Sequence, residues 1–169
     1  HNSVPAYGWI KRGHKKELKT NTGRKRVNIN GALNLDGLDV VMRTDDSINA
    51  QSTIALLNQI ESKHDEKTEV IYIICDNARY YRSKLVKEYL EKSRIELVFL
   101  PPYSPNLNLI ERLWKFFKKK VLYNTYIETF TEFKIRCDDF FGSLSKYKSE
   151  LKTLITEKFQ IIGTLTPKT

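Results

Sequence analysis

The sequence is poor in the residues that mark several common protein classes. Its 169 residues include only two cysteines, one methionine and three histidines. Cys75 and Cys137 lie far apart and neither belongs to a CxxC pair, so we expect two reduced core residues in a cytosolic protein. His1, His14 and His64 do not have the spacing of metal ligands and receive no role. No apolar run reaches about 18 residues, which excludes a membrane-spanning helix by the usual criterion.

The chain also has no internal repeat, no low-complexity tract and no linker rich in Pro, Gly or Ser. A hydrophobic content of 40% is typical of a globular protein, and the length suits one domain, residues 1–169. The first residues, HNSVPAYGW, lack the basic start and apolar core of a signal peptide. They also lack an initial Met, so we expect an N-terminally truncated fragment of a longer protein.

Positive charge is the main feature that is present in excess. The chain has 29 Lys and Arg residues against 20 Asp and Glu residues, a formal net charge of +9. Such an excess favours a polyanionic partner, of which nucleic acid is the commonest.

The pattern of apolar residues predicts an α/β protein. Residues 27–35 alternate apolar and polar side chains, and Asp36-Gly37 then predicts a tight hairpin turn into residues 38–42. Residues 47–63 are expected to form a helix capped by Ser47, and residues 83–93 a shorter helix that presents Leu85, Val86, Tyr89 and Leu90 on one side. Buried strands are predicted at 69–75 and 94–100, and helices at 108–124 and through most of 128–158. Strand–helix–strand–helix after a hairpin indicates a mixed sheet.

Two carboxylates are expected to meet at the edge of this sheet. Asp76 ends the strand predicted at 69–75, and sites in open α/β sheets lie beyond the carboxyl ends of strands. Glu111 lies in the first turns of the helix at 108–124, beside an apolar stripe that includes Trp114. Two adjacent carboxylates favour a divalent cation between them. Considered singly, each acid has an ordinary alternative: Asp76 as a turn or cap residue, and Glu111 as an acid that the helix dipole favours.

A longer motif connects these two acids. Asp76-Asn77-Ala78 and the stretch LPPYSPNLNLIERLW, residues 100–114, resemble the catalytic core of DDE transposases of the mariner-type superfamily, in its bacterial insertion-sequence branch. The 34 residues between Asp76 and Glu111 match the spacing of that superfamily. The segments YGWIKRG, 7–13, and FQIIG, 159–163, also resemble this branch. Leu109 stands where the family has proline, a change without chemical consequence.

The resemblance implies a third carboxylate that the motif does not contain. The family's first Asp precedes the segment that begins here at Tyr7, so we expect it upstream of His1, on a strand missing from this chain. The alternatives inside the chain are Asp36, Asp39, Asp45 and Asp46. Asp36 is better explained as a turn residue, and Asp45 and Asp46 as residues that cap the following helix.

The fold implied by the resemblance is RNase H-like, a mixed five-stranded sheet with helices on both faces and the first strand in the middle. The implied activity is DNA cleavage at transposon ends and strand transfer, with Asp76 and Glu111 as ligands of a two-metal site that holds Mg²⁺ or Mn²⁺. The implied partners are double-stranded DNA and a second copy of the chain, and the expected location is the cytoplasm, on the nucleoid of a bacterium. Asn77 and Asn108 could orient the site or serve only as turn residues.

Basic residues near the motif fit a DNA-binding surface. Lys115, Lys118 and Lys119 follow Glu111 on the same helix, where the alternative is an ordinary solvated face. A second group occupies the N-terminal segment: Lys11, Arg12, Lys15, Lys16, Lys19, Arg24, Lys25 and Arg26. Their contacts would be with phosphates and independent of sequence. Trp9 and Tyr103 could stack on bases, whereas Trp114 is expected to pack in the core.

Two other functions remain compatible with the sequence. One is a catalytically dead remnant of a transposase that only binds DNA or dimerises, which the missing Asp favours. The other is a nuclease of the same fold with another substrate. The intact spacing between Asp76 and Glu111 favours the transposase.

Overall fold

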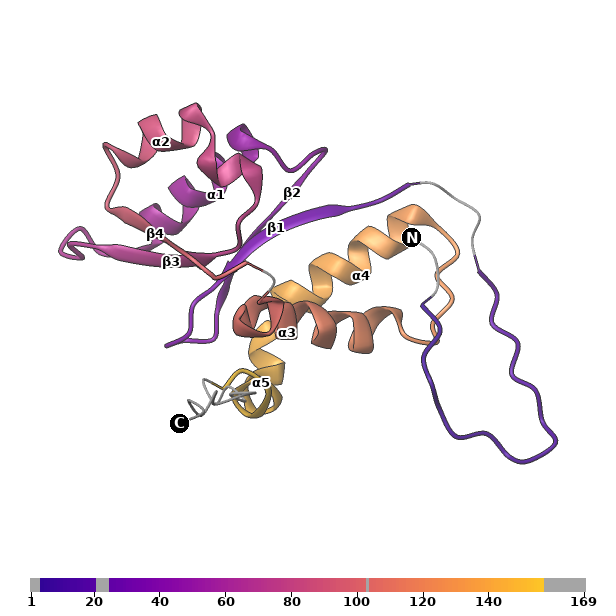
Figure 1. Ribbon diagram of the computed structural model, residues 1–169. Coiled ribbons are helices and arrows are strands. Elements are labelled where there is room, and N and C mark those ends of the chain that lie inside the picture. The colour runs from indigo at the N-terminus through magenta and orange to yellow at the C-terminus, as the bar shows by residue number, and fades with distance from the viewer. Residues whose placement is uncertain (1–3, 21–24, 103, 157–169) are drawn as a thin grey trace, which may run out of the picture.

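The computed structural model describes residues 4–20, 25–102 and 104–156 (Figure 1). Its regular strands are β1 (Asn28–Leu33), β2 (Val40–Asp45), β3 (Ile71–Cys75) and β4 (Ile95–Phe99). The α-helices are α1 (Ala50–Lys63), α2 (Lys84–Leu90), α3 (Leu109–Phe117), α4 (Phe130–Gly142) and α5 (Lys148–Leu154). Short 3₁₀ turns η1 (Arg79–Arg82), η2 (Pro105–Leu107) and η4 (Leu144–Tyr147) connect them, and the π-turn η3 (Lys118–Leu122) continues α3.

The predicted hairpin is present, but its turn is longer than Asp36-Gly37 indicates. β1 and β2 pair antiparallel from Asn28 opposite Asp45 to Leu33 opposite Val40, which leaves a six-residue connection. Asn34 closes this loop through its backbone N–H to Asp39 O at 2.9 Å and its side chain to Asp39 Oδ1 at 3.1 Å. The left-handed position is Leu38, at φ 54°, and not Gly37. The prediction of a two-residue turn was wrong because the side chains of Asn34 and Asp39 stabilise a wider loop.

The strands form two small sheets within the described residues. β1 pairs with β2, and β3 pairs with β4 in parallel, from Ile71 opposite Ile95 to Cys75 opposite Phe99. The structure is therefore α/β, as predicted. A single five-stranded mixed sheet does not form from the described strands.

Two cores lie on opposite sides of the hairpin. Ile29, Leu33 and Val40 pack against the core that α3, α4 and α5 share, while Ala32 and Val41 pack against the core of α1, α2, β3 and β4. This division follows from the alternation of side chains along a strand. Figure 1 shows α1 and α2 on one side of β1 and β2, with α3, α4 and α5 on the other.

The parallel sheet is covered on one face only, in the described part of the chain. Ile71, Ile95 and the half-buried Ile73 and Leu97 contact the α1–α2 core. On the opposite face, Tyr72, Ile74 and Val98 keep 66%, 51% and 44% of their surface exposed. The expectation of helices on both faces therefore holds for the hairpin and fails for β3–β4 here.

The first helix begins two residues later than predicted. Asn49, not Ser47, is the N-cap, because its side chain accepts from Ser52 N at 3.0 Å while Ser52 Oγ accepts from Asn49 N at 2.8 Å. This reciprocal pair satisfies two backbone donors at once, whereas Ser47 only accepts from the Asn49 side chain.

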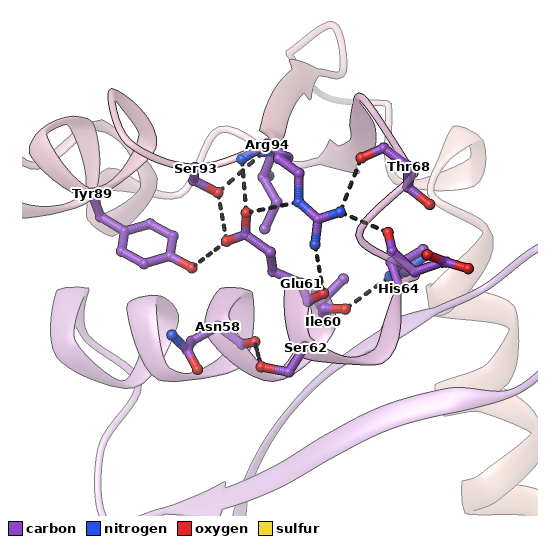
Figure 2. Close-up of polar contacts among 11 residues, drawn as sticks. Asn58, Ile60, Glu61, Ser62, His64, Thr68, Tyr89, Ser93 and Arg94 are labelled. Atoms are coloured by element: carbon purple, nitrogen blue, oxygen red, sulfur yellow. Dashed lines mark hydrogen bonds and ion pairs between the residues drawn. The ribbon is translucent and has the colours of Figure 1, made fainter.

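The end of α1 is fixed by a polar cluster around Glu61 (Figure 2). Glu61 accepts from Tyr89 Oη, Ser93 Oγ and Arg94 N at 2.8–2.9 Å. The Arg94 guanidinium donates to the carbonyls of Glu61, Asp65 and Thr68. The cluster thus joins α1, the turn after α2, the start of β4 and the loop before β3.

The C-terminal half follows the predicted helices closely. Leu113 and Leu151 are fully buried, and Cys137 is buried with them. Trp114 is half-buried and packs edge-on against Phe141, with ring centroids 5.7 Å apart, as its predicted core position requires. In α2, Val86 is fully buried and Tyr89 and Leu90 pack against the same core, but Leu85 is 47% exposed, so Leu85 does not share their side as expected. Among the described residues, none of the helices combines the length and apolar character needed to span a membrane.

Candidate active site at the ends of the parallel strands

The ends of β3 and β4 open into a pocket that contains both predicted carboxylates. Asp76 follows β3 directly, and the loop after β4 supplies the opposite wall. Glu111 enters from the first turn of α3. The pocket has a volume of about 410 Å³ and is lined by Asp76, Asn77, Leu100, Pro101, Pro102, Ser104, Asn108 and Glu111.

The residues that follow β3 form a short turn around Asp76. Asp76 Oδ1 accepts from Ala78 N at 3.0 Å, which is the local hydrogen bond expected of an Asp at such a position. Asp76 therefore does act as a turn residue, but this role occupies only one of its two carboxylate oxygens. The other oxygen accepts no hydrogen bond from the described residues, and the side chain is exposed. The helix that follows is capped by Ser83, through Val86 N, and not by Asp76.

Asn77 joins the ends of the two strands. Its Nδ2 donates to Leu100 O at 2.7 Å, and its Oδ1 accepts from Arg82 Nη2 at 2.6 Å. Leu100 N also donates to Cys75 O at 2.9 Å, which extends the parallel ladder by one step. The edge of the pocket is thus held by side-chain and backbone hydrogen bonds.

Glu111 reaches the pocket because of the way α3 begins. Asn108 occupies the N-cap position without making a side-chain capping hydrogen bond, and both residues line the pocket. Leu109 and Leu113 are buried on the far side of the helix, so the Glu111 side chain is left exposed. An acid in this first turn is also stabilised by the helix dipole.

The negative charge of Asp76 contributes to raised pKa values in two neighbouring side chains. Burial, reinforced by Asp76, raises the pKa of the Cys75 thiol to about 11. Burial also raises the pKa of Tyr80, again with a contribution from Asp76. Both groups are therefore protonated at neutral pH, and Cys75 is the buried, reduced side chain that the sequence indicates.

The other acids considered for the third position lie elsewhere. Asp36 and Asp39 are in the hairpin loop, and Asp36 N donates to the side chain of Asn34. Asp45 forms a two-pronged pair with Arg43 at 2.6 and 2.7 Å, which lowers the Asp45 pKa, so its predicted capping role is wrong. Asp46 is exposed just beyond β2. Across the described ranges, no group of three acidic, His or Cys side chains has the geometry of a metal site.

The structure separates the basic residues into two places. Lys115 is exposed on α3, and Lys118 and Lys119 are exposed on η3, directly after it. Lys11 and Arg12 are exposed on an N-terminal segment without regular structure, which also carries the exposed Tyr7 and Trp9. Lys25 and Arg26 are exposed just before β1, while Arg24 and Tyr103 lie outside the described residues.

Sequence reasoning missed part of the pocket. The loop residues Pro101, Pro102 and Ser104 form part of its wall, and Arg82, outside the lining, donates a hydrogen bond to Asn77. The loop residues were visible as part of the motif, but no role was assigned to them. Arg82 left no signal, because its contact depends on the turn η1, which no sequence pattern indicated.

Comparison with known proteins connects this geometry to a family. A family model for DDE superfamily endonucleases matches residues 1–134. The insertion element IS630 uncharacterized 39 kDa protein of Shigella sonnei is 27% identical over 108 residues, which are 63% of this chain and 31% of that protein.

Solved structures show the same fold. The Mos1 transposase paired-end complex with left transposon end matches with a TM-score of 0.61 and 16% identity, over 90% of this chain and 51% of that one. The Mos1 mariner paired end complex with Mn matches with a TM-score of 0.62 and 18% identity, over 89% and 48%. The chain therefore spans about half the length of these structures and about a third of its curated relative. Since the family model covers most of its length, the chain belongs to the DDE superfamily of endonucleases.

Proposed function

We propose that the chain forms the catalytic part of an insertion-sequence transposase, which cleaves DNA at transposon ends and transfers the strand to target DNA. The observation that carries this proposal is the shared pocket: Asp76 and Glu111 come from different elements and line one hollow. The family match and the IS630 relative support the same function. The Mos1 neighbours are described as complexes with transposon ends, which is consistent with a DNA substrate here.

The donor set of the pocket fits a hard divalent cation. Both carboxylates are exposed, and Asp76 keeps one oxygen without a partner among the described residues. Mg²⁺ and Mn²⁺ take oxygen ligands, commonly one or two carboxylates completed by water and phosphate. Such ions, when bound, supply charge stabilisation for phosphoryl transfer. The protein's part is to hold Asp76 and Glu111 in fixed positions beside the DNA backbone.

The two sheets support the expectation of a strand supplied by residues upstream of His1. β1 lacks a strand partner on the edge away from β2, and so does β3 on the edge away from β4, among the described strands. Ala32 and Val41 share a core with Ile73 and Leu97, so both sheets border the same apolar core, which includes residues of α1. Asn30, on β1, is buried with no acceptor for its Nδ2 within the described residues. A strand between the sheets would carry the third carboxylate to the pocket edge.

The test compares DNA nicking by this chain and by a longer protein that includes the upstream residues, with Mg²⁺ or Mn²⁺. We expect the short chain to be inactive, because two acids hold two ions poorly, and the longer protein to cleave. Asp76→Ala or Glu111→Ala in the longer protein should abolish cleavage while most DNA binding remains. Glu66→Ala, in an exposed loop, is the matched control.

Two results would redirect the proposal. Metal-dependent cleavage by the short chain would place the third ligand inside it, and Asp36, Asp39, Asp45 and Asp46 would have to be tested in turn. Inactivity of the longer protein, with DNA binding intact, would favour the second candidate, a catalytically dead remnant that binds DNA or dimerises. The absence of a three-acid group from the described residues is the observation that keeps this candidate open.

A further inference from the structure

Arg82 makes a contact that neither the motif nor the family match assigns. Its guanidinium lies over the ring of Phe99, 4.4 Å from the centroid, and donates to Asn77 Oδ1 at 2.6 Å. Phe99 is the last residue of β4, and Asn77 is the second residue after β3. Arg82, an exposed residue of η1, therefore bridges the ends of both strands.

The chemistry of the guanidinium fixes the orientation of the Asn77 amide. An arginine can only donate hydrogen bonds, so the group that faces it must be an acceptor, here Asn77 Oδ1. Nδ2 must then point the other way, where it donates to Leu100 O at 2.7 Å. With Arg82 removed, Nδ2 keeps its acceptor, Leu100 O, but Oδ1 loses its donor, so the Asn77 side chain is held at one end instead of two.

The hydrogen bond from Asn77 to Leu100 joins the two walls of the pocket at its edge. Leu100 is the first pocket residue of the loop after β4, and Pro101 and Pro102 follow it. On the other side, Asn77 lies between Asp76 and Ala78, whose backbone N–H binds the Asp76 carboxylate at 3.0 Å. Asn77 therefore links the turn that holds Asp76 to the loop that faces it.

We propose that Arg82 is a positioning residue, which acts through Asn77 to hold Asp76 in the orientation that binds a divalent cation. This inference rests on the proposed function of the pocket. Supporting residues behind metal ligands commonly change metal affinity by about 10- to 100-fold when removed. Because Arg82 acts through a second side chain, we expect an effect near the lower limit, about tenfold.

The experiment titrates MnCl₂ into this 169-residue chain and follows the broadening of backbone amide signals near Asp76 by NMR. Arg82→Ala should weaken the apparent Mn²⁺ affinity about tenfold and should shift the signal of the Asn77 side-chain amide, whose Oδ1 loses its donor. Arg79→Ala is the matched control, since Arg79 is an exposed arginine of the same turn, η1, and the described structure gives it no contact with Asn77. Its loss removes the same charge and should change the affinity less than about twofold.

A second variant separates positioning from folding. Arg82→Lys keeps one donor and the positive charge but loses the planar stack on Phe99, so we expect partial recovery of both the affinity and the Asn77 signal. If Arg82→Ala unfolds the chain, the proposal is tested instead by comparing the apparent Mn²⁺ affinities of Arg82→Lys and Arg79→Lys. Equal affinities in that pair would overturn the proposal.

The carboxylate variants distinguish the two levels of inference. If Asp76→Ala and Glu111→Ala leave the Mn²⁺ broadening unchanged, the proposed function of the pocket fails, and with it the role of Arg82. If both variants abolish the broadening while Arg82→Ala behaves like Arg79→Ala, the pocket stands and the Arg82 inference alone is wrong.

Discussion

Glu61 shows how one carboxylate can join several elements without a catalytic role. Its two oxygens accept hydrogen bonds from the hydroxyl groups of Tyr89 and Ser93 and from the backbone N–H of Arg94. The backbone N–H of Arg94 is the main cause of the lowered pKa of Glu61, with the Ser93, Tyr89 and Arg94 side chains adding to it. Asp76, by contrast, has one oxygen bound and remains exposed. This difference separates a structural acid from a candidate ligand.

We expect Glu61→Gln to lower the free energy of unfolding by about 1–3 kcal/mol at pH 7, because an amide cannot accept all of these donors. The pKa of Glu61 is lowered from 4.5 in the folded state, so its contribution is present above that pH and is lost as the pH falls through the folded value. Urea unfolding between pH 7 and pH 3 should therefore show a smaller loss of stability in the variant than in the wild type. Glu66→Gln is the control, and a parallel pH dependence in wild type and Glu61→Gln would contradict the assignment.

At the scale of elements, α3 connects the core to the pocket. Leu113 is fully buried on one side of the helix, while Glu111 is exposed to the pocket on another. The helix then continues as a π-turn, closed by Tyr123 N to Lys118 O at 3.0 Å, which carries the exposed Lys118 and Lys119. Burial of the apolar stripe thus fixes the direction in which the acid and the lysines point.

Leu113→Ala should lower the free energy of unfolding by about 2–5 kcal/mol, since truncation leaves a cavity in a packed core. Leu85→Ala, an exposed leucine on α2, should change it by less than about 0.5 kcal/mol. Thermal or urea unfolding measures both. Similar losses in the two variants would mean that α3 is not packed as described.

Gly31 permits close packing of β1 against side-chain and backbone atoms of β2, beside Trp114 of α3. A Cβ added there would lie 3.1 Å from Val41 O and Met42 Cγ and 3.5 Å from Trp114 Cη2. Gly31→Ala is therefore expected to destabilise the protein by about 1 kcal/mol or more, through overpacking. Gly142→Ala, where no atom lies within 4 Å, should be neutral or stabilising by up to about 1 kcal/mol. Equal effects in urea unfolding would argue against the contact.

The elements were largely predictable from the sequence because their apolar periods are clear. The strands at β3 and β4 and the helix at α3 follow the predicted segments. The prediction failed where several side chains compete for the same backbone groups. The N-cap of α1 is Asn49 and not Ser47, and a hydrogen bond between Asn34 and Asp39 closes a loop wider than the predicted two-residue turn. The pairing of Asp76 with Glu111 in one pocket was expected from the sheet edge, but the support from Arg82 could not be, since it depends on tertiary stacking over Phe99.

At the scale of the whole molecule, some basic side chains form ion pairs with acids, while others are exposed to solvent. Several basic side chains are already paired, such as Lys120 with Glu150 at 2.9 Å and Arg136 with Glu132 at 2.8 Å. Lys118 and Lys119 are exposed beside the helix that carries Glu111, and the N-terminal segment adds Lys11 and Arg12. These exposed groups are the ones we propose for contact with DNA phosphates.

We expect weak, sequence-independent binding to duplex DNA that falls steeply as salt rises, since phosphate contacts release counterions. The double variant Lys118→Ala/Lys119→Ala should reduce the slope of log affinity against log salt by about 1.8, because each lysine that neutralises a phosphate contributes about 0.9. Lys87→Ala/Lys92→Ala, which removes two exposed lysines at α2 and the turn after it, is the control of equal charge. Fluorescence anisotropy at several salt concentrations measures both, and equal slopes would remove the lysines of η3 from the interface.

The packing of β1 against α3 also has a kinetic consequence. It joins segments far apart in the chain, whereas the hairpin, the β3–α2–β4 unit and α3 each form from nearby residues. Closing so long a loop costs entropy that local contacts do not require, so this joint should form after the rate-limiting barrier. Ile29→Val, which trims a side chain of β1 that packs against the core of α3, should therefore accelerate unfolding and leave the refolding rate almost unchanged, a φ-value near zero.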